Sequence, residues 1–389
     1  MKLDENITVS NNGFIEKKSV LNRKIKILYT IPNFNTAGSG RALLNVISRI
    51  DKDIFETSIC CRHDKGELFK AAQELTVPIH ISSFTVPMKP RVRGMKNIFE
   101  LSKFFKKINP DIIHSYNYSD DYSEGLASRL SRIKWVYTKK NMGWGSNAWK
   151  IRTRLADAVI PQNEEMIEKF FKTHDKLSLI PIGIDVVEFA NLKKDENIIS
   201  QYNLKDSHPI ILSIANVVPI KGIDYLIKGF SLILEDFDKA KLLIVGEDRT
   251  EYADELKKVV IKEGLQDNVV FTGKQSNIKP FFSMADIFIL SSKKTGEGGP
   301  ISILESMASG VLTYGSDVPG IRDQFREFPD QLFESENPGA IANKIIHAVK
   351  MDDKVRREKI KLQKEFISKN YSIENEVRRL QELYINLVQ

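Results

Sequence analysis

Two glutamates in the last third of the chain, Glu297 and Glu305, are separated by seven residues in the stretch EGGPISILE. The apolar run DIFILSS at 286–292 precedes them and predicts a buried strand. A helix is expected to follow, which puts Glu297 in the turn after the strand and Glu305 inside the helix. Ligands of α/β sheets bind beyond the carboxyl ends of the strands. The two carboxylates are therefore candidates for ligand binding or catalysis.

The residues between the two glutamates are suited to an anion. Pro300 fits the first helical position, because its missing N–H would have no partner there, and Gly299 is then the expected N-cap. The free N–H groups of Ile301 and Ser302 would lie at the positive end of the helix dipole, where a phosphate is stabilised. Gly310 fits the left-handed position just after the helix.

The glutamates themselves are suited to hydroxyl groups. Glu305 lies about one and a half turns into the expected helix, where its carboxylate can accept hydrogen bonds from a diol. Phosphate together with a polyol indicates a nucleotide sugar. The alternative is that Glu297 and Glu305 are solvated surface acids, which is the usual fate of a lone glutamate. The glycines, the proline and the preceding strand favour the ligand site.

Both halves of the chain alternate short apolar runs with helical patterns. The runs of the first half are KIKILYTIP (24–32), FETSICCRH, VPIHIS, DIIHSY (111–116), KWVYTK (134–139) and DAVIP (157–161). Those of the second half are PIILSIA (209–215), AKLLIVG (240–246), NVVFTG (268–273), DIFILSS and VLTYGS (311–316). Apolar strands that alternate with helices indicate a parallel sheet covered on both faces. We therefore expect an α/β protein of two doubly wound domains with a cleft between them.

Composition narrows the class of protein. The 389 residues are 42% hydrophobic and 28% charged, as is typical of globular proteins. No apolar run is long enough for a transmembrane helix, and residues 1–22 lack the apolar segment of a signal peptide. Cys60 and Cys61 are adjacent, so their side chains would point to opposite faces of a strand, and no disulfide is expected. The six histidines lack the spacing of a zinc site, and no metal is expected.

Positive charge is concentrated in the first half of the chain. Residues 1–190 hold 30 Lys and Arg against 21 Asp and Glu, whereas the rest holds 28 against 30. An excess of this kind indicates an anionic partner: a membrane surface, a nucleic acid or a phosphorylated ligand.

The segment 88–110 carries seven of these basic residues and one acid. It is expected mainly as a surface helix that packs its apolar face on the sheet. Its basic side makes 88–107 a candidate contact with an anionic membrane surface. Nucleic acid is not expected as a partner, because no recognition module accompanies the charge.

The combined features resemble the retaining glycosyltransferases of family 4, which have the GT-B fold. Glu297 and Glu305 match the family's E-x7-E motif. Further resemblance lies in SIANVVPIKGIDYLIKGF (213–230), LLIVGED (242–248), VVFTGKQSNIKPFFSMADIFILSS (269–292) and IPIGIDVVEF (180–189). It extends over nearly all of the chain after the first residues.

The resemblance implies a division of the chain into domains. Residues 1–22 are expected as a polar, poorly ordered leader, and 23–190 as a Rossmann-like acceptor-binding domain. A second Rossmann-like domain, 191–370, would bind the nucleotide sugar. The helix expected at 371–389 would pack back on the first domain.

The resemblance also implies roles for the residues of the second half. Glu297 would meet the donor sugar near its reacting carbon, Glu305 would bind the ribose hydroxyls, and Lys221 would neutralise the diphosphate. Glu297 and Lys221 are thus the expected catalytic residues, although a lone lysine is more commonly a solvated surface residue. The family often has Gly-Arg where this chain has Ala215 and Asn216, so a second cation is missing and Asn216 would hydrogen-bond phosphate. The full expected donor set is Gly38, Ser39, Gly40, Asn216, Lys221, Gly273, Gly298, Gly299, Pro300, Ile301 and Glu305.

In the first half the expected site residues are fewer. NTAGSGR (35–41) is predicted as a glycine-rich turn between a strand and a helix, facing the diphosphate and acceptor across the cleft; an ordinary tight turn is the alternative. His114 is either an acceptor-side residue or a satisfied, half-buried histidine. Lys140 or Asn141 stands where the family often has a histidine, so both are acceptor-side candidates.

The resulting expectation is a hexosyltransferase that moves a sugar from a nucleotide-diphosphate donor, with UDP the expected nucleotide, to a carbohydrate or glycolipid acceptor. The anomeric configuration would be retained, and the setting would be bacterial cell-surface polysaccharide assembly. Lys221 and the helix near Pro300 would stabilise the leaving group, so no metal cofactor is expected. The expected location is the cytoplasm, at the inner face of the membrane. The alternatives are a nucleotide-sugar epimerase or hydrolase of the same fold, and a non-catalytic nucleotide-sugar-binding protein.

Overall fold

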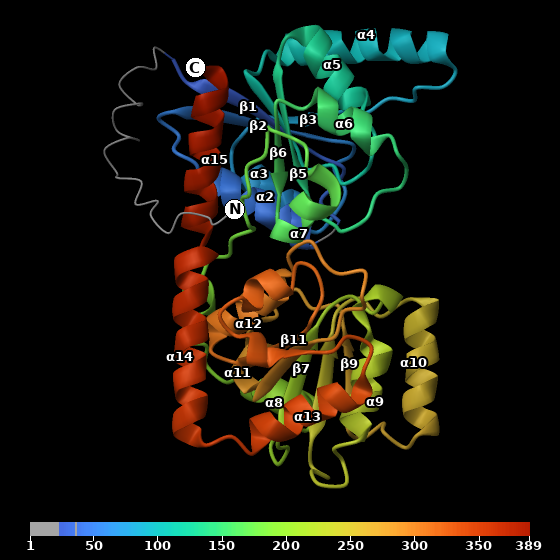
Figure 1. The fold of residues 1–389 in the computed structure, drawn as a ribbon, viewed down its shortest axis with the longest axis vertical. Helices are drawn as coiled ribbons and strands as arrows, with labels where there is room; N and C mark the ends of the chain where they lie inside the picture. The colour runs from blue at the N-terminus through green and yellow to red at the C-terminus, as the bar shows by residue number, and fades with distance from the viewer. Residues whose placement is uncertain (1–22, 36) are drawn as a thin grey trace.

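Two six-stranded parallel sheets, one in each half of the chain, form the two domains of the protein (Figure 1). The computed structural model describes residues 23–35 and 37–389, so the leader predicted for 1–22 lies outside the described residues. The expectation of two doubly wound domains is confirmed. The domain boundaries near 190 and 370 stay a proposal.

The sheet of the first domain has the strand order β3-β2-β1-β4-β5-β6. Its strands are β1 (Ile25–Ile31), β2 (Phe55–Cys61), β3 (Ile79–Ile81), β4 (Ile112–Ser115), β5 (Lys134–Lys139) and β6 (Ala158–Pro161). The helices between them are α2 (Ala37–Arg49), α3 (Phe69–Glu74), α4 (Arg91–Ile108), α5 (Ser123–Ser131), α6 (Trp149–Leu155) and α7 (Glu164–Met166). The order reverses between β1 and β4, where an open α/β sheet leaves a crevice at its carboxyl edge.

The second domain repeats this plan with the order β12-β11-β10-β7-β8-β9. Its strands are β7 (Ile210–Ile214), β8 (Lys241–Val245), β9 (Val269–Gly273), β10 (Ile287–Leu290), β11 (Leu312–Ser316) and β12 (Leu332–Phe333). Its helices are α8 (Glu196–Gln201), α9 (Ile223–Ser231), α10 (Glu251–Lys262), α11 (Lys279–Met284), α12 (Ile301–Ser309) and α13 (Pro338–Val349). The order reverses here between β7 and β10, at the crevice where β10 leads into the E-x7-E stretch.

Both faces of each sheet are buried. In β1, Ile27 and Tyr29 join the apolar core beneath α2, whereas Leu28 joins the core beneath α4 and α5. In β7, Ile211 and Leu212 divide in the same way between two cores. Neighbouring strand residues point to opposite faces, so a strand buried on both sides reads as a continuous apolar run. Helices cover the faces, which leaves the carboxyl edges of the two sheets to build a site.

Two C-terminal helices connect the domains a second time. The first, α14 (Asp353–Asn370), lies along the second domain, and α15 (Ile373–Val388) lies along the first (Figure 1). The apolar side of α15 enters the core of the first domain, where Tyr384 is fully buried. The expected return of the C-terminal helix to the first domain is therefore confirmed. None of the helices in 23–35 and 37–389 is long and apolar enough to cross a membrane.

Candidate active site

A cavity of about 470 Å³ lies between the two domains, at the carboxyl edges of their sheets. The first domain contributes Gly38 and Arg41 of α2 to its lining. The second domain contributes most of the wall, including Asn216, Lys221, Gly246, Ile301, Ser302 and Glu305. The structure thus brings together residues that are up to 270 positions apart in the sequence, from Asn35 to Glu305. This size suits a small polar ligand, within the range usual for ligand pockets.

Helix α12, whose first residues line the cavity, begins one residue later than expected. Pro300 is its N-cap, with φ −70° and ψ 116°, and Ile301 is the first helical residue. Pro300 is therefore the N-cap and not the first helical residue that was predicted, and Gly299 precedes the N-cap and is not the N-cap itself. Ile301 and Ser302 line the cavity as expected. Gly310 ends the helix in the left-handed conformation, with φ 81°, as predicted.

Glu297 forms an ion pair with Lys221, a lining residue of the cavity, although Glu297 itself is not among the lining residues. The Lys221 Nζ atom donates to Glu297 Oε1 at 2.6 Å. The Ser292 hydroxyl donates to the same oxygen at 2.6 Å, which fixes the orientation of the carboxylate. The two residues predicted to be catalytic are therefore in direct contact, and they can bring a cation and a carboxylate to the same end of a ligand.

Glu305 is the buried acid of the cavity. Its relative exposure is 5%, and burial raises the pKa of its carboxyl to about 7, although the nearby Arg41 guanidinium lowers it. A buried carboxylate needs hydrogen-bond donors to offset the loss of water. Among the described residues, no hydrogen bond to the Glu305 carboxylate is present. Hydroxyl groups of a ligand in the cavity would supply such donors.

The backbone around Glu297 is held by the first domain. The Asn163 Nδ2 atom donates to the carbonyl oxygens of Gly298 at 2.7 Å and Glu297 at 3.2 Å. A Cβ atom at Gly298 would lie 1.7 Å from the Lys140 carbonyl oxygen. This approach is possible only for glycine. Gly298 therefore lets the backbones of the two domains meet beside Glu297.

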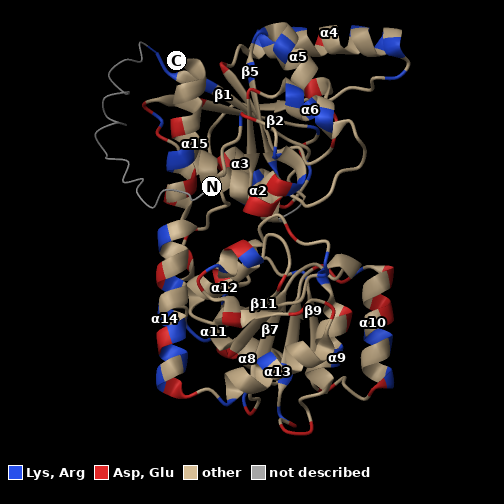
Figure 2. Ribbon diagram, viewed as in Figure 1, with Lys and Arg blue, Asp and Glu red and all other residues tan. Residues whose placement is uncertain are grey.

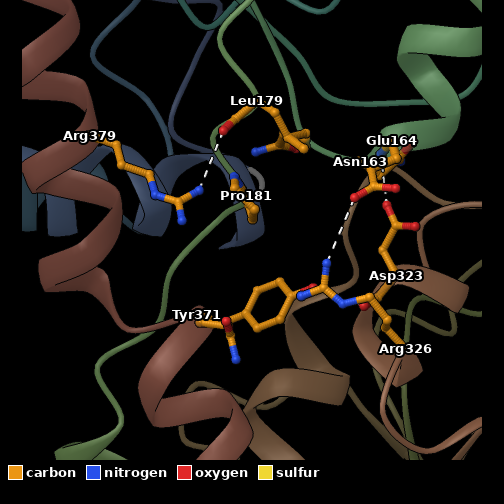
Figure 3. A pocket seen from close by; sticks show the side chains of 10 residues that line it. Asn163, Glu164, Leu179, Pro181, Asp323, Arg326, Tyr371 and Arg379 are labelled. Atoms are coloured by element: carbon orange, nitrogen blue, oxygen red, sulfur yellow. Dashed lines mark hydrogen bonds and ion pairs between the residues drawn. The ribbon is translucent and has the colours of Figure 1, made fainter. Parts of the chain in front are cut away.

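A second, smaller hollow of about 110 Å³ lies at the same domain junction (Figure 3). Here Asp323 of the second domain accepts a hydrogen bond from the Glu164 backbone N–H at 2.8 Å, and Arg326 lies 3.8 Å from the Glu164 carboxylate. The Arg379 guanidinium donates to the Leu179 carbonyl oxygen at 3.5 Å. The volume of this hollow is much smaller than that of the cavity lined by Lys221 and Glu305. We interpret the hollow as a contact between the domains and not as the site.

The chain matches known protein families over most of its length. Residues 36–188 match the family described as glycosyltransferase family 4, and residues 194–371 match glycosyl transferases group 1. The protein belongs to glycosyltransferase family 4. It is accordingly a retaining glycosyltransferase with a nucleotide-sugar donor.

Individual relatives of this family 4 glycosyltransferase are distant in sequence. It is 23% identical to the Escherichia coli UDP-Gal:alpha-D-GlcNAc-diphosphoundecaprenol alpha-1,3-galactosyltransferase, over 94% of this chain and 98% of that protein. Its fold is similar to that of a Rickettsia africae glycosyltransferase, with a TM-score of 0.83, 21% identity, and 94% and 99% of the two chains covered. It is also similar to an Anabaena protein in complex with UDP and glucose, with a TM-score of 0.78, 15% identity, and 92% and 98% covered. The GT-B fold expected from the sequence is confirmed.

The remaining donor-side predictions fall in different places in the glycosyltransferase. Gly38, Ser39 and Gly40 lie within the first turn of α2 and not in a turn before it, because the helix begins at Ala37. Gly38 lines the cavity, whereas Gly40 is buried against Phe34 and Leu68. Asn216 lines the cavity as well.

Gly273 ends β9 in the left-handed region, with φ 70°. It is not among the lining residues, although Lys274, the next residue, is.

The acceptor-side candidates are not brought to the cavity lining. His114 is fully buried, with its ring nitrogens 2.6 Å from the Tyr384 hydroxyl and 2.8 Å from the Thr138 hydroxyl. Burial lowers its pKa to about 3, so the ring is neutral. This geometry favours the satisfied core histidine over an acceptor contact.

Lys140 and Asn141 lie where the two domains meet. The Lys140 Nζ atom is buried 4.0 Å from the centroid of the Tyr116 ring, and burial lowers its pKa to about 7. The backbone of Lys140, and not its ammonium group, is what approaches Gly298. Asn141 is exposed and accepts a hydrogen bond from Lys139.

Several residues of the site were not predicted from the sequence, among them Gly246 and Lys274 of the lining, Asn163 and Arg41. Asn163 caps α7 by accepting from the Met166 N–H at 2.8 Å, and its position before two acids fits an N-cap, but nothing local indicates the contact with Glu297. Arg41 ends the segment 35–41 that was expected to face the diphosphate, but no role was predicted for its side chain, whose place in the cavity depends on the arrangement of the domains.

Proposed function

We propose that the protein transfers a sugar from a UDP-sugar to a saccharide or lipid-linked saccharide acceptor during assembly of a bacterial cell-surface polysaccharide. The observation that carries this proposal is the Lys221–Glu297 ion pair beside a cavity that also contains the buried Glu305. A cation, a helix N-terminus and a diol-binding carboxylate are the groups that a nucleotide diphosphate sugar needs.

The geometry suggests an orientation for the donor. Glu305 would accept hydrogen bonds from the ribose hydroxyls, and the N–H groups of Ile301 and Ser302 would meet the diphosphate. Lys221 would then contact the phosphate that carries the sugar, and Glu297 would lie beside the sugar itself. Asn216 lines the same wall and would donate to a phosphate oxygen.

The proposed reaction retains the configuration at the sugar carbon. The bond from this carbon to the diphosphate oxygen breaks, and the acceptor oxygen forms its bond to the carbon on the same face. The acceptor proton passes to an oxygen of the departing diphosphate. Negative charge therefore grows beside Lys221 and the start of α12, where a preorganised cation and a helix dipole stabilise it. Within the described residues no group of His, Cys, Asp and Glu is placed to hold a metal ion. We propose that Lys221 and the N-terminus of α12 take the place of a metal ion.

The identity of the acceptor is supported by the names of relatives. One acts on GlcNAc-diphosphoundecaprenol in Escherichia coli, and another, 24% identical over 84% of this chain, is an O-antigen biosynthesis glycosyltransferase. A lipid-linked saccharide is therefore the acceptor class that we propose.

The test is a screen for donor and product. Thermal unfolding should be measured with UDP, GDP, ADP and their glucose and galactose conjugates; a nucleotide at 100-fold its dissociation constant adds about 2.7 kcal/mol to stability. The stabilising donor is then incubated with lipid-diphosphate saccharides, and the first product is examined by proton NMR. A larger saccharide with retained configuration supports the proposal. Donor hydrolysis or epimerisation alone, or binding of UDP with no turnover, would support the alternative functions instead.

We also propose that the segment 88–107 contacts an anionic membrane surface, at the inner face of the membrane. Figure 2 shows basic residues along α4, at the end of the first domain that is farthest from the second. The helix packs one face on the domain through Ile98, Leu101 and Phe105. A second face carries Val92, Met95 and Phe99, which are 87%, 68% and 51% exposed.

These three side chains recur at helical spacing and share one stripe of α4. Lys96 and Lys103 lie beside the stripe on the helix, and Lys103 contacts the Phe99 ring, with its Nζ atom 4.6 Å from the centroid. An apolar stripe bordered by basic residues is the pattern of a helix that lies in a lipid interface.

Vesicle sedimentation tests this part of the proposal. The wild type should bind vesicles that contain phosphatidylglycerol and release them as salt rises, since charges are screened beyond about 8 Å at physiological ionic strength. The triple variant Arg91→Glu, Arg93→Glu and Lys96→Glu should lose binding but keep activity on a soluble acceptor. The double variant Lys258→Glu and Lys262→Glu on α10 is the control, because it reverses the charge of exposed lysines in the other domain. Unchanged sedimentation of the triple variant would contradict the membrane contact.

A further inference from the structure

Among the described residues, three cationic side chains line the cavity, and two of them already have acidic partners. Lys221 is 2.6 Å from Glu297 Oε1, and Lys274 is 2.9 Å from Glu67 Oε2. The third is Arg41. Within residues 23–35 and 37–389, its guanidinium makes no hydrogen bond or ion pair. Arg41 is therefore the one cation among the described lining residues that is available to a ligand.

The dipole of its own helix does not stabilise Arg41. Helix α2 begins at Ala37, so Arg41 begins its second turn, and no acidic residue is present in the first turn. The positive end of the helix dipole favours anions and not cations, and its effect falls off beyond the first turn. Local stability thus gives no reason for an arginine here, whereas an anion bound in front of the helix would.

The N-terminal turns of α2 and α12 meet across the cavity. A Cβ atom at Gly38 would lie 3.9 Å from the Ile301 Cδ1 atom, and both residues line the cavity. The two helices come from opposite domains, and each directs its positive end toward the same space. An anion between them would be stabilised from both sides, and Arg41 adds a full charge to the side of the first domain.

Glu305 indicates which phosphate Arg41 would meet. Arg41 is close enough to Glu305 for its charge to act on the carboxyl. Lys221, in contrast, is paired with Glu297, the acid at the other end of the proposed donor. If Glu305 binds the ribose, the phosphate nearest to Arg41 is the one bonded to the ribose. A guanidinium suits this task because it binds phosphate oxygens through two parallel hydrogen bonds.

We propose that Arg41 is a second phosphate-binding cation of the donor site, supplied by the first domain, and that it binds the phosphate next to the ribose. This inference rests on the proposed function, since it takes a nucleoside diphosphate as the ligand. Asn216, on the opposite wall, is neutral, and Arg41 supplies the second positive charge from the first domain. Lys221 then binds the other phosphate, which carries the sugar.

Calorimetric titration with UDP, UMP and uridine tests the assignment. Arg41→Ala should weaken binding of UDP and UMP roughly 10- to 100-fold, the range for charged hydrogen bonds, and change binding of uridine by less than about 2-fold. Arg41→Lys should recover only part of the loss, because a point charge does not reproduce the planar fork. Arg129→Ala on α5, an exposed arginine of the same domain, is the control and should bind all three ligands like the wild type.

Two outcomes would overturn the assignment without touching the proposed function. An equal loss for uridine and UDP would mean that Arg41 contacts the nucleoside, and unchanged UDP binding in Arg41→Ala would mean that it contacts neither. Failure of the wild type to bind any nucleoside diphosphate would overturn the proposed function as well.

Discussion

The contact between Gly298 and Lys140 leads to a prediction for the addition of a single methyl group at Gly298. In Gly298→Ala the new Cβ atom would lie 1.7 Å from the Lys140 carbonyl oxygen, whereas real Cβ contacts are essentially never under 3.0 Å. The loop or the domain junction must therefore move by more than 1 Å at this point. Glu297 is the preceding residue, and its backbone carbonyl is held by Asn163 in the same contact.

The expected result is a large loss of turnover with little change in nucleotide binding. A misplacement of about 1 Å at a reacting group can cost roughly 100-fold in rate, which is close to 3 kcal/mol in the barrier. Glu305 and the start of α12 bind the nucleotide part of the donor in our proposal and do not depend on this contact. Turnover should thus fall about 100-fold or more, and the dissociation constant of UDP should change by less than about 3-fold.

The neighbouring glycine provides the control. A Cβ atom at Gly299 would meet the Ile182 Cγ2 atom at 3.4 Å, an ordinary contact. Gly299→Ala should therefore keep at least half of the wild-type turnover, measured with the same donor and acceptor. Full turnover in Gly298→Ala would refute the conclusion that this backbone approach positions Glu297.

Four further predictions concern the charges of the site. Lys221→Ala should cost about 2–4 kcal/mol in the barrier and much less in donor affinity, because negative charge grows on the leaving diphosphate; normal turnover by steady-state kinetics would remove its role. Glu305→Ala should mainly raise the KM for donor, since a ribose contact is present before and during the reaction, and a collapse of turnover at unchanged KM would contradict the ribose contact. Burial raises the Glu305 pKa from 4.5 to about 7, so its contribution to stability is present at low pH and is lost as pH rises through about 7; Glu305→Gln should lose less stability than the wild type between pH 5 and 8 in chemical denaturation. EDTA should leave most of the activity, and complete loss restored by manganese would show that a metal neutralises the diphosphate.

Much of the fold could be predicted because the strands are buried on both faces. The run of β10, IFIL, is apolar and buried at each position, and that of β1 has only Lys26 and Thr30 among its apolar residues. The exception is β12, which has only Leu332 and Phe333 and is too short to form a pattern. The start of α2 was also misplaced, because Gly38 and Gly40 suggest a turn although both are helical.

The site was predictable where one segment carries it. Glu297, Ile301 and Glu305 belong to a single turn and helix, so their spacing could be interpreted directly. Asn163 and Arg41 act on the second domain from the first, and their roles depend on how the domains are placed. His114 is the opposite case. A histidine at the end of a strand suggested a contact with the acceptor, but only the tertiary structure reveals that both ring nitrogens already have hydrogen-bond partners.

The two connections between the domains lie side by side. The Ile184 N–H donates to the Tyr371 carbonyl oxygen at 2.9 Å, and the Ile373 N–H donates to the Ile184 carbonyl oxygen at 2.8 Å. Beside them, the buried Glu376 carboxylate accepts from the Gly183 N–H at 2.7 Å. We expect two segments joined in this way to act as one short hinge, because a rotation of the domains about it keeps these hydrogen bonds whereas a sliding motion would break them. Displacement then grows with the distance from the hinge, and a rotation of a few degrees moves the far wall of the cavity most. An extra residue inserted in only one of the two connections would tilt this axis and misalign both halves of the site at once, without altering any residue that touches the ligand.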